Sequence, residues 1–239
     1  MGLISYAQNF EDIMLWRALG HIEKGSYIDI GAQDPSFDSV SRCFYENGWR
    51  GVHVEPTSAY AAMLRDQRPD EIVVEAIAGR EHGMSTLFEI PATGLSTGRP
   101  DIASHHAERG FPFIERLVPS ITLASIFDSL GARDIHWMKI DVEGMERSVL
   151  EGWGDHAARP WVLAIESTYP GSRTPTECEW MDLVIERGYR EVWFDGLSRF
   201  FVAEGHDDLQ AAFDLPPNVF DGFSITLCPS SEHLAQLAA

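Results

Sequence analysis

Short apolar runs alternate with amphipathic segments along most of this chain, and this alternation constrains the fold more than any other feature. We expect strands over residues 26–30, 52–54, 135–140 and 161–165, with a further one starting at 72–74. We expect helices over residues 8–19, 36–47, 58–67, 143–151 and 174–187. Strands and helices that alternate in this way form a mainly parallel sheet with helices packed on it. The sequence therefore predicts an α/β fold.

The carboxyl-terminal part of the sequence adds strands without intervening helices. Runs at 189–194 and 199–202 flank Asp195-Gly196 and predict a hairpin-like pair that closes the sheet. A last strand is expected within residues 223–227. We expect all of these elements to form one domain over residues 1–239, in which residues 1–24 are an N-terminal helical cap.

Residues 91–119 interrupt the alternation. They are rich in proline and glycine, they show little apolar periodicity, and they carry Phe111, Phe113 and Ile114 as apolar side chains for packing. Long irregular segments inside compact domains commonly serve as lids or binding loops. We therefore expect this segment to form a lid.

The charge of the chain limits its expected partners. Lys and Arg number 18 against 37 Asp and Glu, which gives a formal net charge of −19. An acidic surface repels phosphate backbones and anionic lipids, so we expect neither nucleic acid nor a membrane surface as a partner. The apolar runs are too short to span a membrane, and the N-terminus lacks the features of a secretory signal. We expect a cytoplasmic protein.

The first two expected strands end in residues typical of a nucleotide site. Asp29-Ile30-Gly31-Ala32 stands at the carboxyl end of the first strand, and Glu55-Pro56 follows the second about one βαβ unit later. Open α/β sheets bind ligands outside the carboxyl ends of their strands, where a glycine admits the ligand and an acid holds the hydroxyls of a ribose. This spacing predicts a cofactor that contains adenosine.

Two adenosine cofactors fit this arrangement unequally. NAD needs a Gly-x-Gly-x-x-Gly turn, but the segment after the first strand offers only Gly31 and then Asp34-Pro35. The Asp34 carboxylate would repel a pyrophosphate, whereas it would not repel the sulfonium of S-adenosylmethionine. The residues therefore favour S-adenosylmethionine over a nicotinamide cofactor.

Acidic residues also end the later strands. Asp141 follows the apolar run that ends at Ile140, and Glu166 ends the next expected strand. Acids at neighbouring strand ends can hold a divalent cation or accept a proton from a hydroxyl. Asp141 is the stronger candidate because it falls beside the expected cofactor cleft, whereas we interpret Glu146 as a helix-start acid.

Several segments together resemble the FkbM-type S-adenosylmethionine-dependent methyltransferases. They are residues 5–12, 27–32, 48–56 and 138–144. Residues 194–202 and 216–221 resemble a subgroup of that family, which more often has Asn at the position of Ser198 and Tyr at that of Phe201. The resemblance covers most of the chain. It implies a class I methyltransferase with a Rossmann-like, doubly wound, mostly parallel sheet of seven strands and an N-terminal helix.

The resemblance also implies roles for individual residues. The implied cofactor-binding residues are Asp29, Gly31, Ala32, Glu55, Pro56, Glu75, Ala76, Ile77 and Asp141. Gly31 would line the methionine part, Glu55 the ribose, and Glu75 with its two successors the adenine. Asp141 and Glu166 are the expected catalytic residues. Many family members methylate hydroxyls of sugars on glycans or natural products, so a sugar hydroxyl is the expected acceptor.

Magnesium, the acceptor and the assembly remain open. Some related macrolide-sugar methyltransferases have a Glu-Asp pair after the fifth strand, where this chain has Glu166-Ser167, so Mg²⁺ held by Asp141 and Glu166 is an option and not a requirement. A catalytically silent module that binds the cofactor and acts through a partner is one alternative, and a nicotinamide oxidoreductase is another. The sequence does not decide between oxygen and nitrogen as the methylated atom, or whether the chain forms a homo-oligomer.

Overall fold

A sheet of seven strands forms the centre of the computed structural model, which describes residues 2–131 and 133–225. The strand order is β10-β11-β9-β8-β2-β3-β4. The strands are β2 (Ser26–Ile30), β3 (Arg50–Val54), β4 (Ile72–Val74), β8 (Trp137–Ile140), β9 (Val162–Glu166), β10 (Tyr189–Phe194) and β11 (Ser198–Ala203). Neighbours from β4 to β9 pair in parallel, and β11 pairs antiparallel with both β9 and β10. The prediction of a mostly parallel, seven-stranded α/β sheet is confirmed, and β11 makes the sheet mixed.

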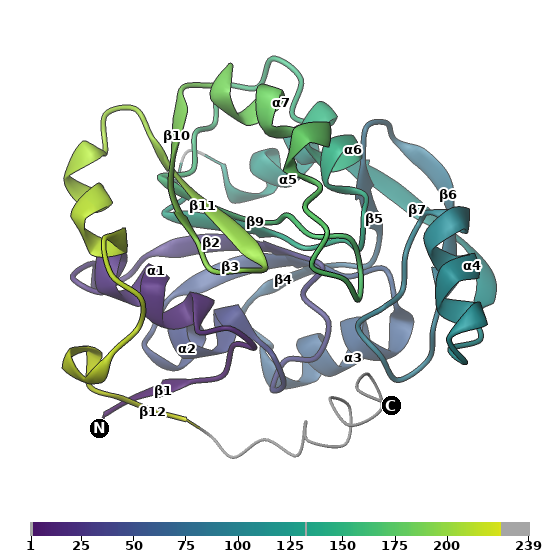
Figure 1. Cartoon of the computed structure of the whole chain (residues 1–239), viewed down its shortest axis with the longest axis horizontal. Coiled ribbons are helices and arrows are strands. Elements are labelled where there is room, and N and C mark those ends of the chain that lie inside the picture. Colours follow the sequence, from purple (N-terminus) through teal and green to yellow (C-terminus); the bar gives the residue numbers. More distant parts are fainter. Residues whose placement is uncertain (1, 132, 226–239) are drawn as a thin grey trace.

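Helices cover both faces of this sheet (Figure 1). On one face lie α1 (Glu11–Leu19), α2 (Val40–Glu46) and α3 (Ser58–Gln67), and on the other lie α5 (Leu123–Leu130), α6 (Glu146–Glu151) and α7 (Met181–Ile185). The helix expected over 174–187 is wrong in its first part, because Pro175 pairs with Thr168 in an antiparallel bridge. A short 3-10 helix, η1 (Glu177–Glu179), follows before α7 begins.

The central strands are buried on both faces, so alternate side chains enter two separate cores. Ile28 and Ile30 of β2 belong to the core beneath α5 and α6. Tyr27 points to the opposite face, where its ring stacks on that of Trp137 with the centroids 4.6 Å apart. Asp29 and Lys139 are paired residues of β2 and β8, and they occupy the next positions of this second row. Two charged side chains therefore enter the face covered by α1 and α2, close to the carboxyl ends of the strands.

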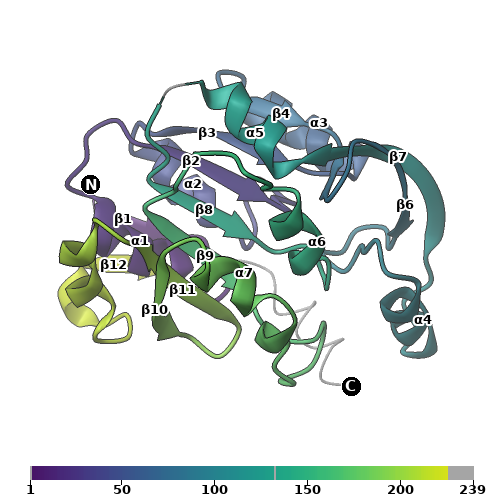
Figure 2. The same cartoon turned by 90° about the horizontal axis from the view of Figure 1, so that it is seen from above.

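A smaller sheet of three strands, in the order β5-β7-β6, accompanies the main one. It comprises β5 (Ile77–Gly79), β6 (Gly83–Glu89) and β7 (Ile114–Thr122), and α4 (Pro100–Glu108) lies in the connection between β6 and β7. Figure 2 shows α4, β6 and β7 together at one end of the molecule. The expectation that residues 91–119 are irregular is wrong, since they contain α4 and most of β7. Pro100 stands at the start of α4, where a proline favours a helix and does not break it.

The two ends of the described chain meet in a separate parallel pair. β1 (Leu3–Ser5) pairs with β12 (Phe223–Ile225), and the 3-10 helices η2 (Asp207–Phe213) and η3 (Val219–Asp221) lead to β12. The last strand was expected within 223–227, of which residues 226 and 227 lie outside the described residues. Within the described ranges, no helix has the length and apolar character needed to cross a membrane.

Candidate functional site

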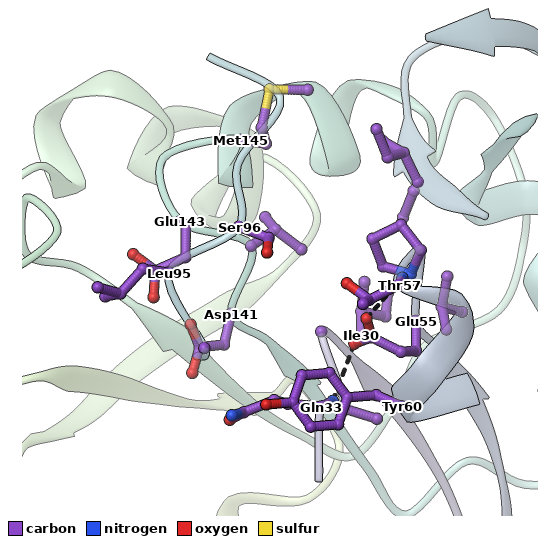
Figure 3. Close-up of a pocket in the computed structure, with 18 of the residues that line it drawn as sticks. Ile30, Gln33, Glu55, Thr57, Tyr60, Leu95, Ser96, Asp141, Glu143 and Met145 are labelled. Atoms are coloured by element: carbon purple, nitrogen blue, oxygen red, sulfur yellow. Dashed lines mark hydrogen bonds between the residues drawn. The ribbon is translucent and has the colours of Figure 1, made fainter. Parts of the chain in front are cut away.

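A pocket opens at the carboxyl ends of β2, β3 and β8 (Figure 3). The chain runs outward from β2 through β3 to β4, and then returns to the other side of β2 to form β8 and β9, so the sheet has its topological switch point at β2. Seven of the residues that the sequence predicts for the site line this pocket: Gly31, Ala32, Glu55, Pro56, Ala76, Ile77 and Asp141. The site therefore lies where an open α/β sheet ordinarily binds its ligand.

Gly31 is the residue that brings the ends of β2 and β8 together. Its φ is +79°, and a Cβ added at this position would stand 1.7 Å from the backbone oxygen of Asp141. Its N–H donates to the carbonyl of Val54 at 2.9 Å, which ties the same turn to the end of β3. Any side chain here would separate the strand ends, so glycine is needed to form the floor of the pocket.

Glu55 is buried at the end of β3, with 4% of its surface exposed. Its Oε2 accepts from the Gln33 N–H at 2.9 Å and its Oε1 from the Thr57 N–H at 2.7 Å (Figure 3). Burial raises the pKa of this carboxyl, and the two backbone donors oppose that shift. Each carboxylate oxygen keeps a second lone pair, so the group can accept from two hydroxyls of a ligand in the pocket.

Two predicted cofactor residues do not line the pocket. Asp29 is buried beneath it, where its Oδ2 lies 3.9 Å from Nδ1 of His53 and its Oδ1 has no hydrogen-bond partner among the described residues. Glu75 forms an ion pair with Arg65 at 2.8 Å, and its side chain is about one-third exposed. The structure thus places Asp29 as a residue behind the pocket and Glu75 outside it.

Asp141 and Glu143 face Glu55 across the pocket (Figure 3). Asp141 Oδ2 accepts from the Lys139 ammonium at 2.7 Å, and Lys139 itself is buried, with 7% of its surface exposed. Burial alone would lower the pKa of Lys139, but the carboxylates of Asp141, Asp29 and Glu11 raise it instead. Sequence reasoning did not select Lys139, although a lysine inside an apolar strand is itself unusual.

Three carboxyl groups gather beyond Lys139, at the ends of β8 and β9. Asp141, Glu143 and Glu166 each offer one oxygen, and these oxygens all lie within 4.8 Å of one another. Glu143 Oε2 and Glu166 Oε2 are buried, and neither has a hydrogen-bond partner among the described residues. Burial raises the pKa of Glu143 and of Glu166 well above the ordinary value, and the neighbouring carboxyls raise both further. The predicted pair of Asp141 and Glu166 is brought together, and Glu143 joins it.

The backbone of Glu143 has an uncommon conformation, with φ at +53°. Glu146 stabilises this turn because its Oε1 accepts from the N–H groups of Val142 and Gly144. The hydroxyl of Thr97, in the predicted lid segment, donates to the Glu143 carbonyl at 2.7 Å. A non-glycine residue held in this region commonly marks a functional site. Such a conformation leaves no direct trace in the sequence, which explains why Glu143 was not selected.

The N-terminal turn also contributes to the pocket. Gln8 and Glu11 both line it, and Glu11 is buried, with 3% of its surface exposed. Its Oε2 accepts from the Asn9 N–H at 2.9 Å. Burial, with a smaller contribution from Asp195, raises the pKa of Glu11 to about 7. The acid was expected only as part of a helix start, because the sequence does not reveal that this helix docks over the strand ends.

Comparisons with known proteins assign the family. The model of the family described as the Methyltransferase FkbM domain matches residues 29–191, which is more than half of the chain. The chain belongs to the FkbM methyltransferase family. The resemblance found in the sequence is thus confirmed, and membership implies S-adenosylmethionine as the methyl donor. Gln8, Glu11 and the rest of the N-terminal turn precede the matched FkbM region.

Solved structures similar to this FkbM-family chain are distant in sequence. A precorrin-6y C5,15-methyltransferase from Geobacter metallireducens GS-15 is 13% identical, with a TM-score of 0.42 over 80% of this chain and 84% of that one. A candidate S-adenosyl-L-methionine-dependent methyltransferase from Methanococcus maripaludis is 9% identical, with a TM-score of 0.38 over 82% and 87%. A search of curated proteins found no significant match.

Proposed function

We propose that this protein transfers the methyl group of S-adenosylmethionine to a hydroxyl of a sugar, on a glycan or on a glycosylated natural product. The cofactor would lie along the strand ends, with its adenine beside Ala76 and Ile77, its ribose hydroxyls on Glu55 and its thioether chain over Gly31. These contacts follow the order of the strands from β4 through β3 to β2. The next strands in the same direction, β8 and β9, carry Asp141 and Glu166 and would face the acceptor.

The observation that carries the proposal is the group of three carboxyls on the acceptor side. A sugar hydroxyl is a weak nucleophile at neutral pH, so its attack on the sulfonium methyl gains from a carboxylate that accepts its proton. Asp141, paired with the Lys139 ammonium, supplies such a carboxylate next to the floor formed by Gly31, and Glu143 and Glu166 stand beside it with raised pKa values that favour their protonated forms. In the transfer, the hydroxyl oxygen bonds to the methyl carbon, the carbon–sulfur bond breaks, and a carboxylate takes the hydroxyl proton.

The same three residues fit a divalent cation. Carboxylate oxygens are the ligands that Mg²⁺ prefers, and two oxygens of this group are buried without a hydrogen-bond partner among the described residues. Asp141, Glu143 and Glu166 would hold the ion, which would lower the pKa of a bound hydroxyl. The function proposed here does not depend on it, because Asp141 can act as the proton acceptor without a metal.

The turn after β2 supports this cofactor over a nicotinamide. Asp34 Oδ1 accepts from the N–H groups of Ser36 and Phe37, so an acid occupies the turn where a dinucleotide would need free backbone donors. A silent module that only binds the cofactor remains the second candidate. The buried, unpartnered oxygens of Glu143 and Glu166 favour an enzyme over such a module, because binding the cofactor alone does not require them.

An acceptor screen with radiolabelled S-adenosylmethionine tests the proposal. Sugar nucleotides, oligosaccharides and glycosylated natural products serve as acceptors, with matched deoxy sugars as controls for the methylated position. We expect label transfer to a sugar oxygen, and mass spectrometry identifies the position. Treatment with EDTA followed by Mg²⁺ shows whether the carboxyl group requires a metal. Binding of S-adenosylhomocysteine without transfer to any class of acceptor would favour the silent module.

A further inference from the structure

We infer that Lys139 and Glu11 bind the amino-acid tail of the cofactor, with Lys139 holding its carboxylate and Glu11 its ammonium. This inference rests on the proposed cofactor and deepens it, because it assigns the zwitterionic end of the ligand to two named side chains. Neither residue was given a role from the sequence, although segments 5–12 and 138–144, which contain them, carry the family resemblance; Glu11 precedes the matched residues 29–191.

Lys139 is a buried cation with donors left over. The chain has two lysines, and Lys24 is exposed whereas Lys139 lies in the pocket lining with 7% of its surface exposed. An ammonium has three N–H donors, and one of them donates to Asp141. Among the described residues no other acceptor is within hydrogen-bond distance of this ammonium. A buried ammonium with unused donors at a pocket wall is suited to an anionic group of a ligand.

Glu11 supplies the opposite charge beside it. The carboxyl is buried, it lines the same pocket, and it is close enough to Lys139 for the two charges to affect each other. Asp29 and Asp141 also surround Lys139, so three carboxylates stand near one ammonium. This part of the pocket can therefore accept a second cation together with an anion, which is the charge pattern of an α-amino acid.

The order of the strands places these side chains at the correct distance from the ribose. Glu55 ends β3, Gly31 ends β2, and Lys139 lies near the end of β8, so the three residues occupy consecutive strands. Neighbouring strands are about 4.8 Å apart, so β3 and β8 are separated by roughly 10 Å. An adenosyl thioether that starts with its ribose on Glu55 and crosses Gly31 reaches β8 with its amino-acid end.

The turn that holds Glu11 is fixed by its own sequence. Asp12 accepts from the Tyr6 N–H at 2.7 Å and from the hydroxyl of Ser5 at 2.8 Å. The side-chain amide of Asn9 donates to the carbonyl of Asp195 at 3.1 Å, which ties the turn to the loop between β10 and β11. Phe10 then takes a positive φ of 63° and α1 begins at Glu11. These contacts hold the Glu11 carboxyl over the strand ends before any ligand binds.

Binding of cofactor fragments to two variants tests the inference. The ligands are S-adenosylhomocysteine, methylthioadenosine, which lacks the amino-acid tail, and the decarboxylated and deaminated analogues of S-adenosylhomocysteine. The variants are Lys139→Met and Glu11→Gln, and the exposed residues Lys24→Met and Glu23→Gln serve as matched controls. Affinities are measured by calorimetry, and circular dichroism checks that each variant is folded.

We expect wild-type protein to bind S-adenosylhomocysteine roughly 100-fold or more tightly than methylthioadenosine, since two hydrogen bonds between charged groups are involved. Lys139→Met should weaken S-adenosylhomocysteine about 10- to 100-fold and leave the decarboxylated analogue unchanged. Glu11→Gln should weaken S-adenosylhomocysteine about 10-fold or more and leave the deaminated analogue unchanged. Both control variants should bind as the wild type does.

Different results separate this inference from the proposed function. If wild-type protein binds methylthioadenosine as tightly as S-adenosylhomocysteine, or if the folded variants weaken both ligands equally, the tail does not contact these residues and the inference is wrong. If neither ligand binds the wild type, the proposed cofactor itself is wrong. Should Lys139→Met fail to fold, the fragment series on the wild type and on Glu11→Gln still decides the question.

Discussion

Replacing Glu55 by glutamine tests the structural account of the cofactor site most directly. Both oxygens of Glu55 already accept a backbone N–H, from Gln33 and from Thr57, and each oxygen has one acceptor position left for a ribose hydroxyl. Glutamine has nearly the same shape, but it replaces one oxygen by an NH₂ group that cannot accept. The variant therefore loses one hydrogen bond to the ribose, and the hydrogen bond that remains is made to an uncharged oxygen.

A hydrogen bond to a charged group contributes about 1.5–3 kcal/mol, which corresponds to an affinity loss of roughly 10- to 150-fold for S-adenosylhomocysteine. The NH₂ group of the variant cannot accept the backbone N–H, of Gln33 or of Thr57, that the replaced oxygen accepted. That buried N–H is left without an acceptor, which costs about 1–3 kcal/mol of folding free energy. That cost should fall at the lower end, since burial raises the pKa of Glu55 and its removal relieves a buried charge.

Calorimetry with S-adenosylhomocysteine and with an analogue that lacks one ribose hydroxyl measures the binding effect. The missing hydroxyl should weaken binding to the wild type, and it should matter much less for Glu55→Gln. Glu186→Gln, at an exposed position directly after α7 and outside the pocket lining, controls for the loss of one negative charge. An unchanged affinity for S-adenosylhomocysteine in a folded Glu55→Gln protein would refute the reasoning and remove Glu55 from the site.

Three further predictions follow from the same geometry. Asp141→Asn should lower turnover roughly 10²- to 10⁴-fold in a methyl-transfer assay at saturating S-adenosylmethionine, where a change in cofactor affinity through Lys139 does not affect the rate; near wild-type turnover would leave positioning alone to drive the reaction. Of the predicted lid, residues 91–99 precede α4 and line the pocket, so limited proteolysis should cut there first and slow when cofactor and acceptor are both bound; equal cleavage with and without ligands would mean that the segment is no lid. In the folded protein the pKa of Glu11 is raised from an ordinary 4.5 to about 7. The protonated carboxyl therefore contributes fully to folding stability below about pH 4.5, and this contribution is lost as the pH rises through 7. Glu11→Gln lacks that loss, so its unfolding free energy relative to wild type should rise by roughly 3 kcal/mol between pH 4 and pH 8 in denaturant titrations; a constant difference would contradict the raised pKa.

The main sheet could be predicted from the sequence because its strands are buried on both faces. Such strands appear as continuous apolar runs, and the acids that follow them mark where each strand ends. The segment 91–119 lacked this signal. β7 carries Ile114 and Leu117 at exposed positions and Pro119 opposite Met84, so its pattern was neither continuous nor alternating. β7 is a strand because it pairs with β5 and β6, and the local sequence does not reveal that pairing.

In the candidate site too, residues that directly follow a strand were predictable and residues placed by long-range contacts were not. Gly31, Glu55 and Asp141 were predictable because each follows a strand directly, so sequence position fixes their place at the sheet edge. Glu143 reaches the pocket through a turn with a positive φ, and Glu11 reaches it through the docking of α1. Both placements depend on contacts between distant segments, which one sequence does not display. Glu75 illustrates the opposite case, since it follows β4 directly and yet pairs with Arg65 outside the pocket.

The charge of the site and the turn after β2 each disfavour a dinucleotide ligand, for independent reasons. The pKa values of Glu11, Glu143, Glu146 and Glu166 are all raised, because each carboxyl is buried and most of them repel one another. Lys139 is the cation of the described pocket lining, and it opposes the raised pKa values of Glu11 and Glu143. A ligand that brings positive charge would favour the ionised forms of these carboxyls and be attracted to them, whereas phosphate groups would raise their pKa values further. A sulfonium cofactor with an α-ammonium brings that positive charge, and electrostatic repulsion would oppose a dinucleotide even if the turn at Asp34 had offered it free backbone donors.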